Sequence, residues 1–128
     1  MATARLNHPY TRADIMRLVG GELQTYLPQR DHVILAGCFT VKNMNPDAPL
    51  IIQVGKPDKV VKKAELLSKQ PENRFPVFLK QNGKEQHYFY AGHFKFKDLK
   101  YDATTITTEE KKSGRFGQVA AILYLQPA

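Results

Sequence analysis

The chain has 128 residues, of which 42% are hydrophobic, with seven Phe and six Tyr, so it is long and apolar enough to fold as one domain and is not intrinsically disordered. Its apolar runs are too short to cross a bilayer, and its N-terminus lacks the apolar stretch of a signal peptide. Its single Cys excludes an internal disulfide. We therefore expect a cytoplasmic protein without membrane contact. The net charge of +7 favours a polyanionic partner, although many small proteins are this basic for solubility alone.

The first half of the chain predicts one helix and three strands. Residues 1–10 are expected to be the flexible N-terminus of a single domain that covers residues 1–128. In residues 11–21, Thr11 and Asp14 are placed as in a capping box, and two glycines end the helix. The pattern then predicts strands at 22–27, 32–41 and 50–55, with a loop rich in Pro and Asn at 42–49.

The second half predicts one more helix, a hairpin and a final strand. Asp58 is expected to cap a helix over 59–70, in which the apolar residues share one side and the lysines lie largely off it. Asn82-Gly83 between two apolar segments predicts a hairpin. Its strands are expected at 75–80 and 85–96, followed by an exposed polar segment with one helical turn at 101–117 and a buried strand at 118–125.

Two short helices and about six strands, without regular alternation, predict an α+β fold. The expected architecture is a bent mixed sheet or a small open β-barrel, with the helices at its ends.

The segment 88–101 raises the main functional question, because its first nine residues hold five aromatic side chains. Period-two alternation puts one set of side chains on one face of a strand: Tyr88, Tyr90, Gly92, Phe94 and Phe96. The opposite face carries Phe89, Ala91, His93, Lys95 and Lys97. We interpret the aromatic face as mainly core and the basic face as phosphate-binding. Because Gly92 leaves space beside it, Tyr90 is expected to stay accessible.

No catalytic motif is present in the sequence. The chain lacks a Walker phosphate loop and a G-x-S-x-G elbow, and its four His and Cys38 do not have metal-ligand spacing. Cys38 lies in an apolar strand, where burial favours an inert thiol. Pro46-Asp47 and Glu110–Lys112 are similar to the halves of a nuclease motif, but they are roughly sixty residues apart and are interpreted as solvated charges. An enzymatic activity is therefore not favoured, and no cofactor or metal is expected.

Two further groups of polar residues are candidates for ligand binding. Gln24, Tyr26 and Arg30 alternate in an extended segment and project from one side, where they can pair with a base edge, stack on a base and bind phosphate. The alternative is an ordinary edge strand with solvated polar groups. The loops before and after the strand at 50–55 can line the mouth of a pocket with Lys42, Asn43, Asn45 and Lys56.

Three stretches carry a family resemblance: YTRADIMRLVGGELQTYLPQRDHVILAGCFTVKNMNPDAP at 10–49, FPVFLK at 75–80 and YFYAGHFKF at 88–96. Together they resemble an uncharacterised bacterial module that occurs alone or beside HNH nuclease domains, in a setting like modification-dependent restriction. The resemblance implies a small β-rich domain that reads DNA, with or without modified bases, somewhat like SRA and PUA-like readers. The matching positions are Gln24, Tyr26, Tyr90 and Gly92. The chain has no His-Asn-His cluster, so the resemblance does not extend to DNA cleavage.

The sequence thus favours a nucleic-acid-binding protein, with DNA as the first choice of ligand. One alternative is a protein that binds a nucleotide or another small anion. The other is a protein-interaction module, such as a subunit or inhibitor of a nuclease. The DNA hypothesis predicts that four cations gather around one pocket beside the Tyr90–Gly92 gap: Arg30, Lys56, Lys95 and Lys97.

Overall fold

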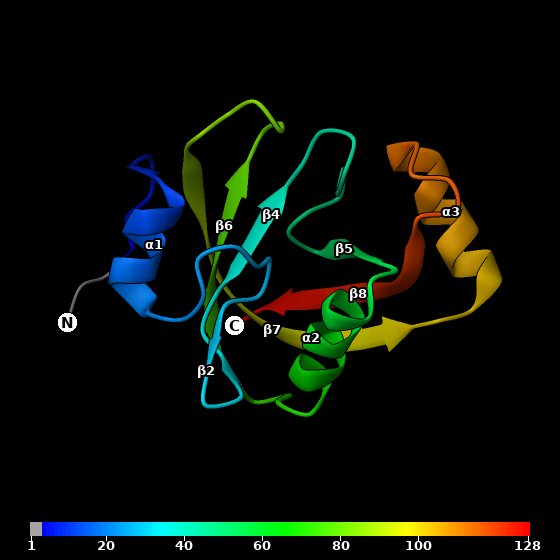
Figure 1. Cartoon of the computed structure of the whole chain (residues 1–128), viewed down its shortest axis with the longest axis horizontal. Coiled ribbons are helices and arrows are strands. Elements are labelled where there is room, and N and C mark those ends of the chain that lie inside the picture. Colours follow the sequence, from blue (N-terminus) through cyan, green and yellow to red (C-terminus); the bar gives the residue numbers. More distant parts are fainter. Residues whose placement is uncertain (1–3) are drawn as a thin grey trace.

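The computed structural model describes residues 4–128, which form three helices and eight strands (Figure 1). The helices are α1 (Arg12–Val19), α2 (Asp58–Ser68) and α3 (Ala103–Ser113). The strands are β1 (Pro9–Tyr10), β2 (Gln29–Arg30), β3 (Val33–Ile34), β4 (Gly37–Thr40), β5 (Ile51–Gly55), β6 (Phe75–Lys80), β7 (Tyr88–Lys100) and β8 (Val119–Pro127). Among residues 4–128, no helix is long and apolar enough to cross a membrane.

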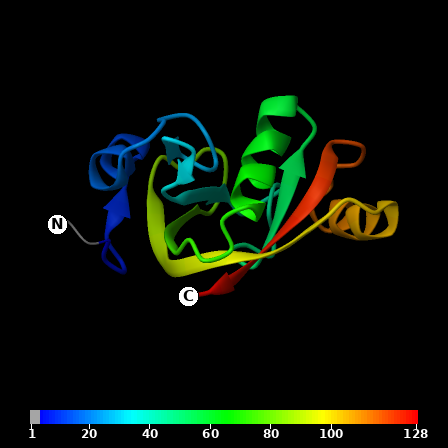
Figure 2. The same cartoon turned by 90° about the horizontal axis from the view of Figure 1, so that it is seen from below.

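Six of the strands form one mixed sheet that curls into a half-barrel (Figure 2). The strand order is β4-β6-β7-β8-β5, and β1 pairs with the start of β7. Only the β4–β6 pair is parallel among these described strands. Helix α2 lies in the hollow of the sheet, while α1 and α3 lie at its two ends (Figures 1 and 2). The predicted α+β class with a bent mixed sheet is confirmed, with three helices in place of two.

The core consists of two clusters of buried side chains. The larger cluster joins Ala64 and Leu67 of α2 to the sheet and includes Phe39 and Phe75. The smaller cluster lies under α1 and contains Ile15, Tyr10, Cys38, Phe78 and Tyr88. The expectation of a flexible segment over residues 1–10 is wrong for Pro9 and Tyr10, because β1 pairs with β7 and Tyr10 is buried. Residues 1–3 lie outside the described part of the chain.

The N-terminal half differs from its prediction in three places. The strand expected at 22–27 is a loop, and the strand expected at 32–41 is divided into β3 and β4. The first piece, β3, pairs with β2 across a two-residue turn at Asp31 and His32, which both have positive φ. The capping box is confirmed, since Thr11 and Asp14 exchange hydrogen bonds of 2.9 and 3.1 Å. Asp58 is not a cap: it is the first residue of α2, and no side chain caps that helix.

Strand β7 is longer than predicted and is interrupted by two bulges. Its antiparallel pairing with β6 confirms the predicted hairpin, although β7 begins at Tyr88 rather than at residue 85. One bulge lies beside Gly92, whose φ is +117°, and the other lies between Phe96 and Asp98. Tyr88 and Phe94 are buried, as expected for the aromatic face. The prediction that alternate residues of this strand lie on two opposite faces is wrong across the bulge at Gly92.

The segment 101–117 is the largest error of the sequence analysis. It contains the eleven-residue helix α3, which begins after the capping residue Asp102 and ends at Gly114. Glu109 and Glu110 are buried rather than solvated. The buried residues of this helix are polar: Glu109, Glu110 and Ser113. Because the helix lacks a buried apolar stripe, the periodicity of hydrophobic residues did not predict it.

Candidate functional site

The segment 22–32 is the centre of the candidate site, because neighbouring surface cavities lie on both sides of it. We call the first cavity the arginine pocket; its volume is about 450 Å³, and it is lined by Arg12, Leu23, Gln24, Thr25, Tyr26, Cys38 and Tyr88. On the other side, two hollows that share Lys59 and Lys63 form the lysine groove along α2. Their volumes are about 310 and 360 Å³, and together they are lined by Glu22, Gln24, Thr25, Tyr26, Gln29, His32, Lys59, Val60, Lys62, Lys63, Glu65, Leu66 and Lys69.

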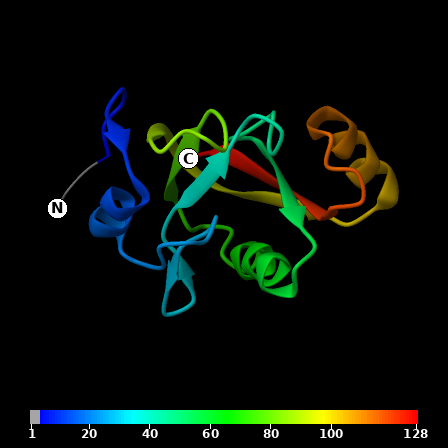
Figure 3. The same ribbon diagram turned by 45° about the horizontal axis from the view of Figure 1, so that its top comes forward.

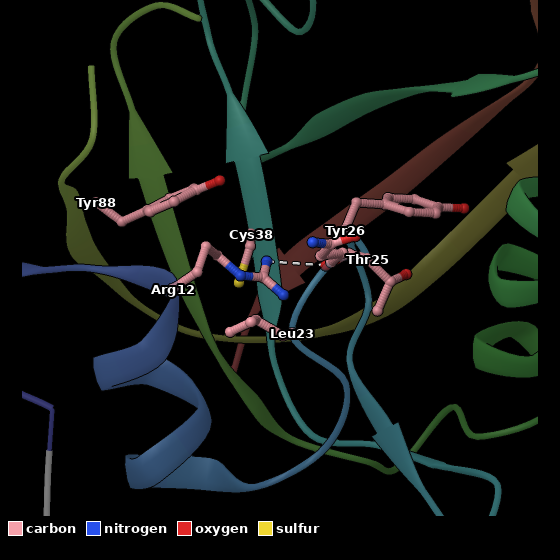
Figure 4. Close-up of a pocket in the computed structure, with 7 residues that line it drawn as sticks. Arg12, Leu23, Thr25, Tyr26, Cys38 and Tyr88 are labelled. Carbon is pink, nitrogen blue, oxygen red and sulfur yellow. Dashed lines mark hydrogen bonds between the residues drawn. The ribbon is translucent and has the colours of Figure 1, made fainter. Parts of the chain in front are cut away.

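Arg12 fixes the wall of the arginine pocket. It is the first residue of α1, so the Thr11 capping box sets where its side chain leaves the helix. Its guanidinium donates hydrogen bonds to the carbonyl oxygens of Thr25 (2.8 Å) and Glu22 (3.2 Å). Figure 4 shows Arg12 and Tyr88 reaching over Cys38 and β4 from two different elements. The Nε atom of Arg12 is buried and has no hydrogen-bond partner among the described residues.

Tyr26 separates the arginine pocket from the lysine groove. Its hydroxyl donates a hydrogen bond of 2.5 Å to the carbonyl oxygen of Val60 on α2. Its carbonyl oxygen accepts a hydrogen bond of 2.9 Å from the amide of Cys38, on β4. Burial raises the pKa of the Tyr26 phenol above its ordinary value, so the hydroxyl stays protonated. The loop is therefore anchored to both the sheet and the helix.

Cys38 contributes an uncharged sulfur to the arginine pocket. Burial raises the pKa of its thiol to about 12, although the nearby Arg12 opposes that rise. The thiolate is the nucleophilic form of cysteine. Cys38 is therefore a poor nucleophile near neutral pH, in agreement with the inert core residue that the sequence indicates.

The lysine groove is strongly basic. Lys63 forms an ion pair with Glu22. Lys62 forms an ion pair of 3.1 Å with Asp58 on the exposed side of α2. Lys59 and Lys69 make no ion pair within residues 4–128. The β2–β3 hairpin, which contributes Gln29 and His32, lies beside α2 (Figure 3). Gln70 holds the hairpin in place through hydrogen bonds with the backbone of Ile34 (3.2 Å) and His32 (2.5 Å).

Of the residues predicted to bind a ligand, two line these cavities. Gln24 and Tyr26 lie between the arginine pocket and the lysine groove. The four cations predicted to gather around one pocket line neither cavity, so that gathering stays a prediction: Arg30, Lys56, Lys95 and Lys97. The guanidinium of Arg30 instead lies close against Gly20. Lys95 and Lys97 lie on the part of β7 that pairs with β8.

Tyr90 stays partly accessible, as expected, but its hydroxyl already contacts another side chain of β7. Tyr90 and His93 were expected on opposite faces of the strand, yet the bulge at Gly92 brings the Tyr90 hydroxyl to hydrogen-bond distance of His93 Nδ1. The Tyr90 ring also packs against Phe78, with ring centroids 5.9 Å apart. Tyr90 and His93 therefore form an exposed contact, and neither lines the arginine pocket.

The loop residues predicted to line a pocket mouth line neither cavity: Lys42, Asn43, Asn45 and Lys56. Asn45 is buried, and its Oδ1 accepts a 2.8 Å hydrogen bond from the amide of Gln53. Arg115 donates a 3.1 Å bond to the carbonyl oxygen of Gln53, so the free edge of β5 is covered by side chains. Asn43 has a φ of +64° and Lys56 is exposed, and neither lines the arginine pocket or the lysine groove.

The same region brings together the two distant halves of the nuclease-like motif. Lys112 pairs with Asp47 at 3.0 Å and with Glu109 at 3.2 Å. Glu110 instead accepts a hydrogen bond from the amide of Val119. Within residues 4–128, no three His, Cys, Asp or Glu side chains gather closely enough to hold a metal ion. The carboxylates of Asp47 and Glu109 thus bind the ammonium group of Lys112.

The sequence analysis missed the residues that define the candidate site. It placed the lysines of α2 off the apolar side of the helix but assigned them no role, and it did not single out Arg12. The spacing of Lys59, Lys62, Lys63 and Lys69 was visible in the sequence, but the loop that faces them was not.

Comparison with protein-family models, curated proteins and solved structures finds no match for this chain. The resemblance to restriction-associated modules therefore stays a prediction.

Proposed function

We propose that this protein binds nucleic acid, with DNA as the first choice, by holding the phosphate backbone along the lysine groove. The observation that carries this proposal is the row of four lysines that line the groove, three in α2 and one at its C-cap: Lys59, Lys62, Lys63 and Lys69. At 1.5 Å per residue, the row extends about 15 Å along the helix. One strand of B-DNA presents about four phosphates over that length, at about 3.4 Å each.

The charges already paired in the groove leave most of this row free for phosphate. The Lys63–Glu22 pair is partly shielded from solvent, so we expect Lys63 to keep its carboxylate. The Lys62–Asp58 pair is exposed on both sides and is therefore weak enough for a phosphate to compete with it. Three lysines then remain for phosphate contacts: Lys59, Lys62 and Lys69. The net charge of +7 supports the approach of such a ligand from a distance.

Salt dependence tests the proposal, because each lysine–phosphate contact releases counterions. We expect the affinity for a fluorescein-labelled DNA duplex, measured by anisotropy, to fall with a log–log slope of about −3 in NaCl. The triple variant Lys59→Gln/Lys62→Gln/Lys69→Gln is expected to lose roughly 100-fold in affinity at about 0.15 M salt and nearly all of that slope. Its melting temperature is expected to stay close to that of the wild type, because these side chains are exposed.

A matched control separates the groove from bulk charge. The variant Lys95→Gln/Lys97→Gln/Lys111→Gln removes the same charge from places outside the groove. It is expected to retain affinity within a few-fold and to keep the salt slope. Equal losses in both triple variants would show that only net charge matters. A loss confined to the second triple would instead place the interface on the strand face of Lys95 and Lys97.

A further inference from the structure

The arginine pocket holds hydrogen-bond donors that the fold does not use. A guanidinium carries five N–H donors. Arg12 uses two of them to hold the backbone at Thr25 and Glu22. Its Nε is buried without a partner, which is an unfavourable state for a polar group. Each terminal nitrogen of Arg12 keeps a second N–H that has no partner among residues 4–128, so a ligand in the pocket can accept hydrogen bonds from both nitrogens.

The other lining residues favour a flat organic ring over a bare anion. The pocket has one cation, whereas the rest of its lining includes Leu23, Tyr88 and the uncharged thiol of Cys38. Its volume of about 450 Å³ lies within the usual range for small-molecule sites, roughly 300–1,000 Å³. Apolar walls with one fork of donors suit a heterocycle that carries acceptors on one edge. A phosphate is better served by the neighbouring lysines.

We propose that the arginine pocket takes one unpaired base of a nucleic-acid strand whose phosphates lie in the lysine groove, and that it prefers guanine. This inference rests on the proposed function. Guanine presents two adjacent acceptors, O6 and N7, to which a guanidinium can donate in parallel. Adenine presents a donor beside its N7 and cannot accept that pair. Gln24 and Tyr26 line both cavities, so a single strand can place phosphate on one side of them and a base on the other.

The test compares single-stranded dT oligonucleotides that carry one central dG, one dA or one abasic site. We expect the wild-type protein to bind the dG strand about tenfold more tightly than the other two, because a good bidentate contact gives discrimination of this order. Arg12→Lys keeps the charge but removes the planar fork, so the preference is expected to fall to twofold or less. The salt slope of the remaining binding is expected to stay the same, since the α2 lysines are unchanged.

A second variant keeps the test valid if Arg12→Lys disturbs the loop. Leu23→Trp fills the pocket from its rim, where Leu23 is 39% exposed, and leaves Arg12 in place. It is also expected to abolish the dG preference. Val33→Trp is the control, because Val33 is similarly exposed but lines neither cavity.

The possible results separate the two proposals. If the strands bind with no preference for dG, or if both pocket variants keep the preference, the base pocket is wrong while the groove stands. If no strand binds at low salt, the base pocket is wrong, and the duplex titration decides separately whether the groove binds DNA.

Discussion

The two ends of the molecule use their polar side chains in different ways. At the α3 end, Gln53, Ser113, Asn45 and Arg115 hydrogen-bond one another and the backbone, and they cover the edge of β5. At the α1–α2 end, Arg12 uses two of its five donors, and exposed lysines face a groove. One oxygen of Glu109 and the Nε of Arg115 are the exceptions at the α3 end. A cluster of polar residues therefore does not mark a site by itself; the two ends differ in that the cations of the α1–α2 end line cavities.

The largest expected effect concerns Cys38, which tests how well the floor of the arginine pocket is shielded. Burial raises the pKa of this thiol from 9.0 to about 12, so its thiolate fraction at about pH 8 is roughly 1000-fold smaller than in the unfolded chain. We expect a thiol reagent such as iodoacetamide to react with the native protein more slowly by about that factor. Reaction at the rate of the urea-unfolded protein would mean that the pocket floor is open to water.

The next effect is expected at the α3 end, from Gln53→Ala. The Gln53 amide donates to the carbonyl oxygen of Glu109 at 2.8 Å and accepts from the Ser113 hydroxyl at 2.7 Å. Its loss leaves two buried groups unpaired and a small cavity, so we expect the free energy of unfolding to fall by about 2–4 kcal/mol. Urea denaturation measures this loss, and DNA affinity should be unchanged. Gln86→Ala, at an exposed position, is the control and is expected to cost less than about 0.5 kcal/mol.

A smaller effect is expected at the other end from Thr11→Ala. Thr11 caps α1 directly before Arg12, and its hydroxyl accepts the amide of Asp14 at 3.1 Å. Loss of such a cap costs about 1 kcal/mol. If the position of Arg12 matters for a ligand, this variant should also weaken the preference for dG, although it lies outside the pocket. A change in stability without any change in that preference would show that the cap serves the fold alone.

The smallest effect is expected from Asp102→Asn, at the start of α3. The side chain and the amide of Thr105 both donate to the Asp102 carboxylate, and these bonds lower its pKa below the ordinary 3.8. Because the folded-state pKa is the lower one, the carboxylate's contribution to stability is full above pH 3.8 and is lost as the pH falls through the folded-state value. Asn is also a good cap. We expect a small difference in melting temperature at about pH 7 that disappears by about pH 2.

Much of the fold was predictable because local chemistry and tertiary structure agree. The Thr11–Asp14 pair and the apolar strand at 118–125 produced the expected elements. The expected hairpin also forms, but residues 81–87 join its strands, and neither Asn82 nor Gly83 has the positive φ of a tight Asn-Gly turn. Helix α3 was missed because its inner face is held by hydrogen bonds rather than by an apolar stripe. Two local features did point to it: Asp102 is a good N-cap residue, and Gly114 adopts the left-handed conformation at its end.

The candidate site was less predictable because it depends on long-range geometry. The bulge at Gly92 redirects the side chains that follow it. Alternation along β7 therefore put Tyr90 and His93 on opposite faces, whereas they are in contact. The arginine pocket joins residues from α1, the 22–27 loop, β4 and β7, which are distant in sequence. Gln24 and Tyr26 were identified for their chemistry, but the cations near them come from α2 and not from β7.

The bond between the Tyr26 hydroxyl and the Val60 carbonyl has a thermodynamic consequence. Tyr26 is a wall of two cavities at once, so a ligand that moves its ring from one side also changes the shape of the other. Linkage requires that such an influence be mutual: whatever factor an occupied pocket applies to affinity in the groove, an occupied groove applies to the pocket. Two ligands that both displace Tyr26 would therefore bind to the cavities cooperatively rather than independently.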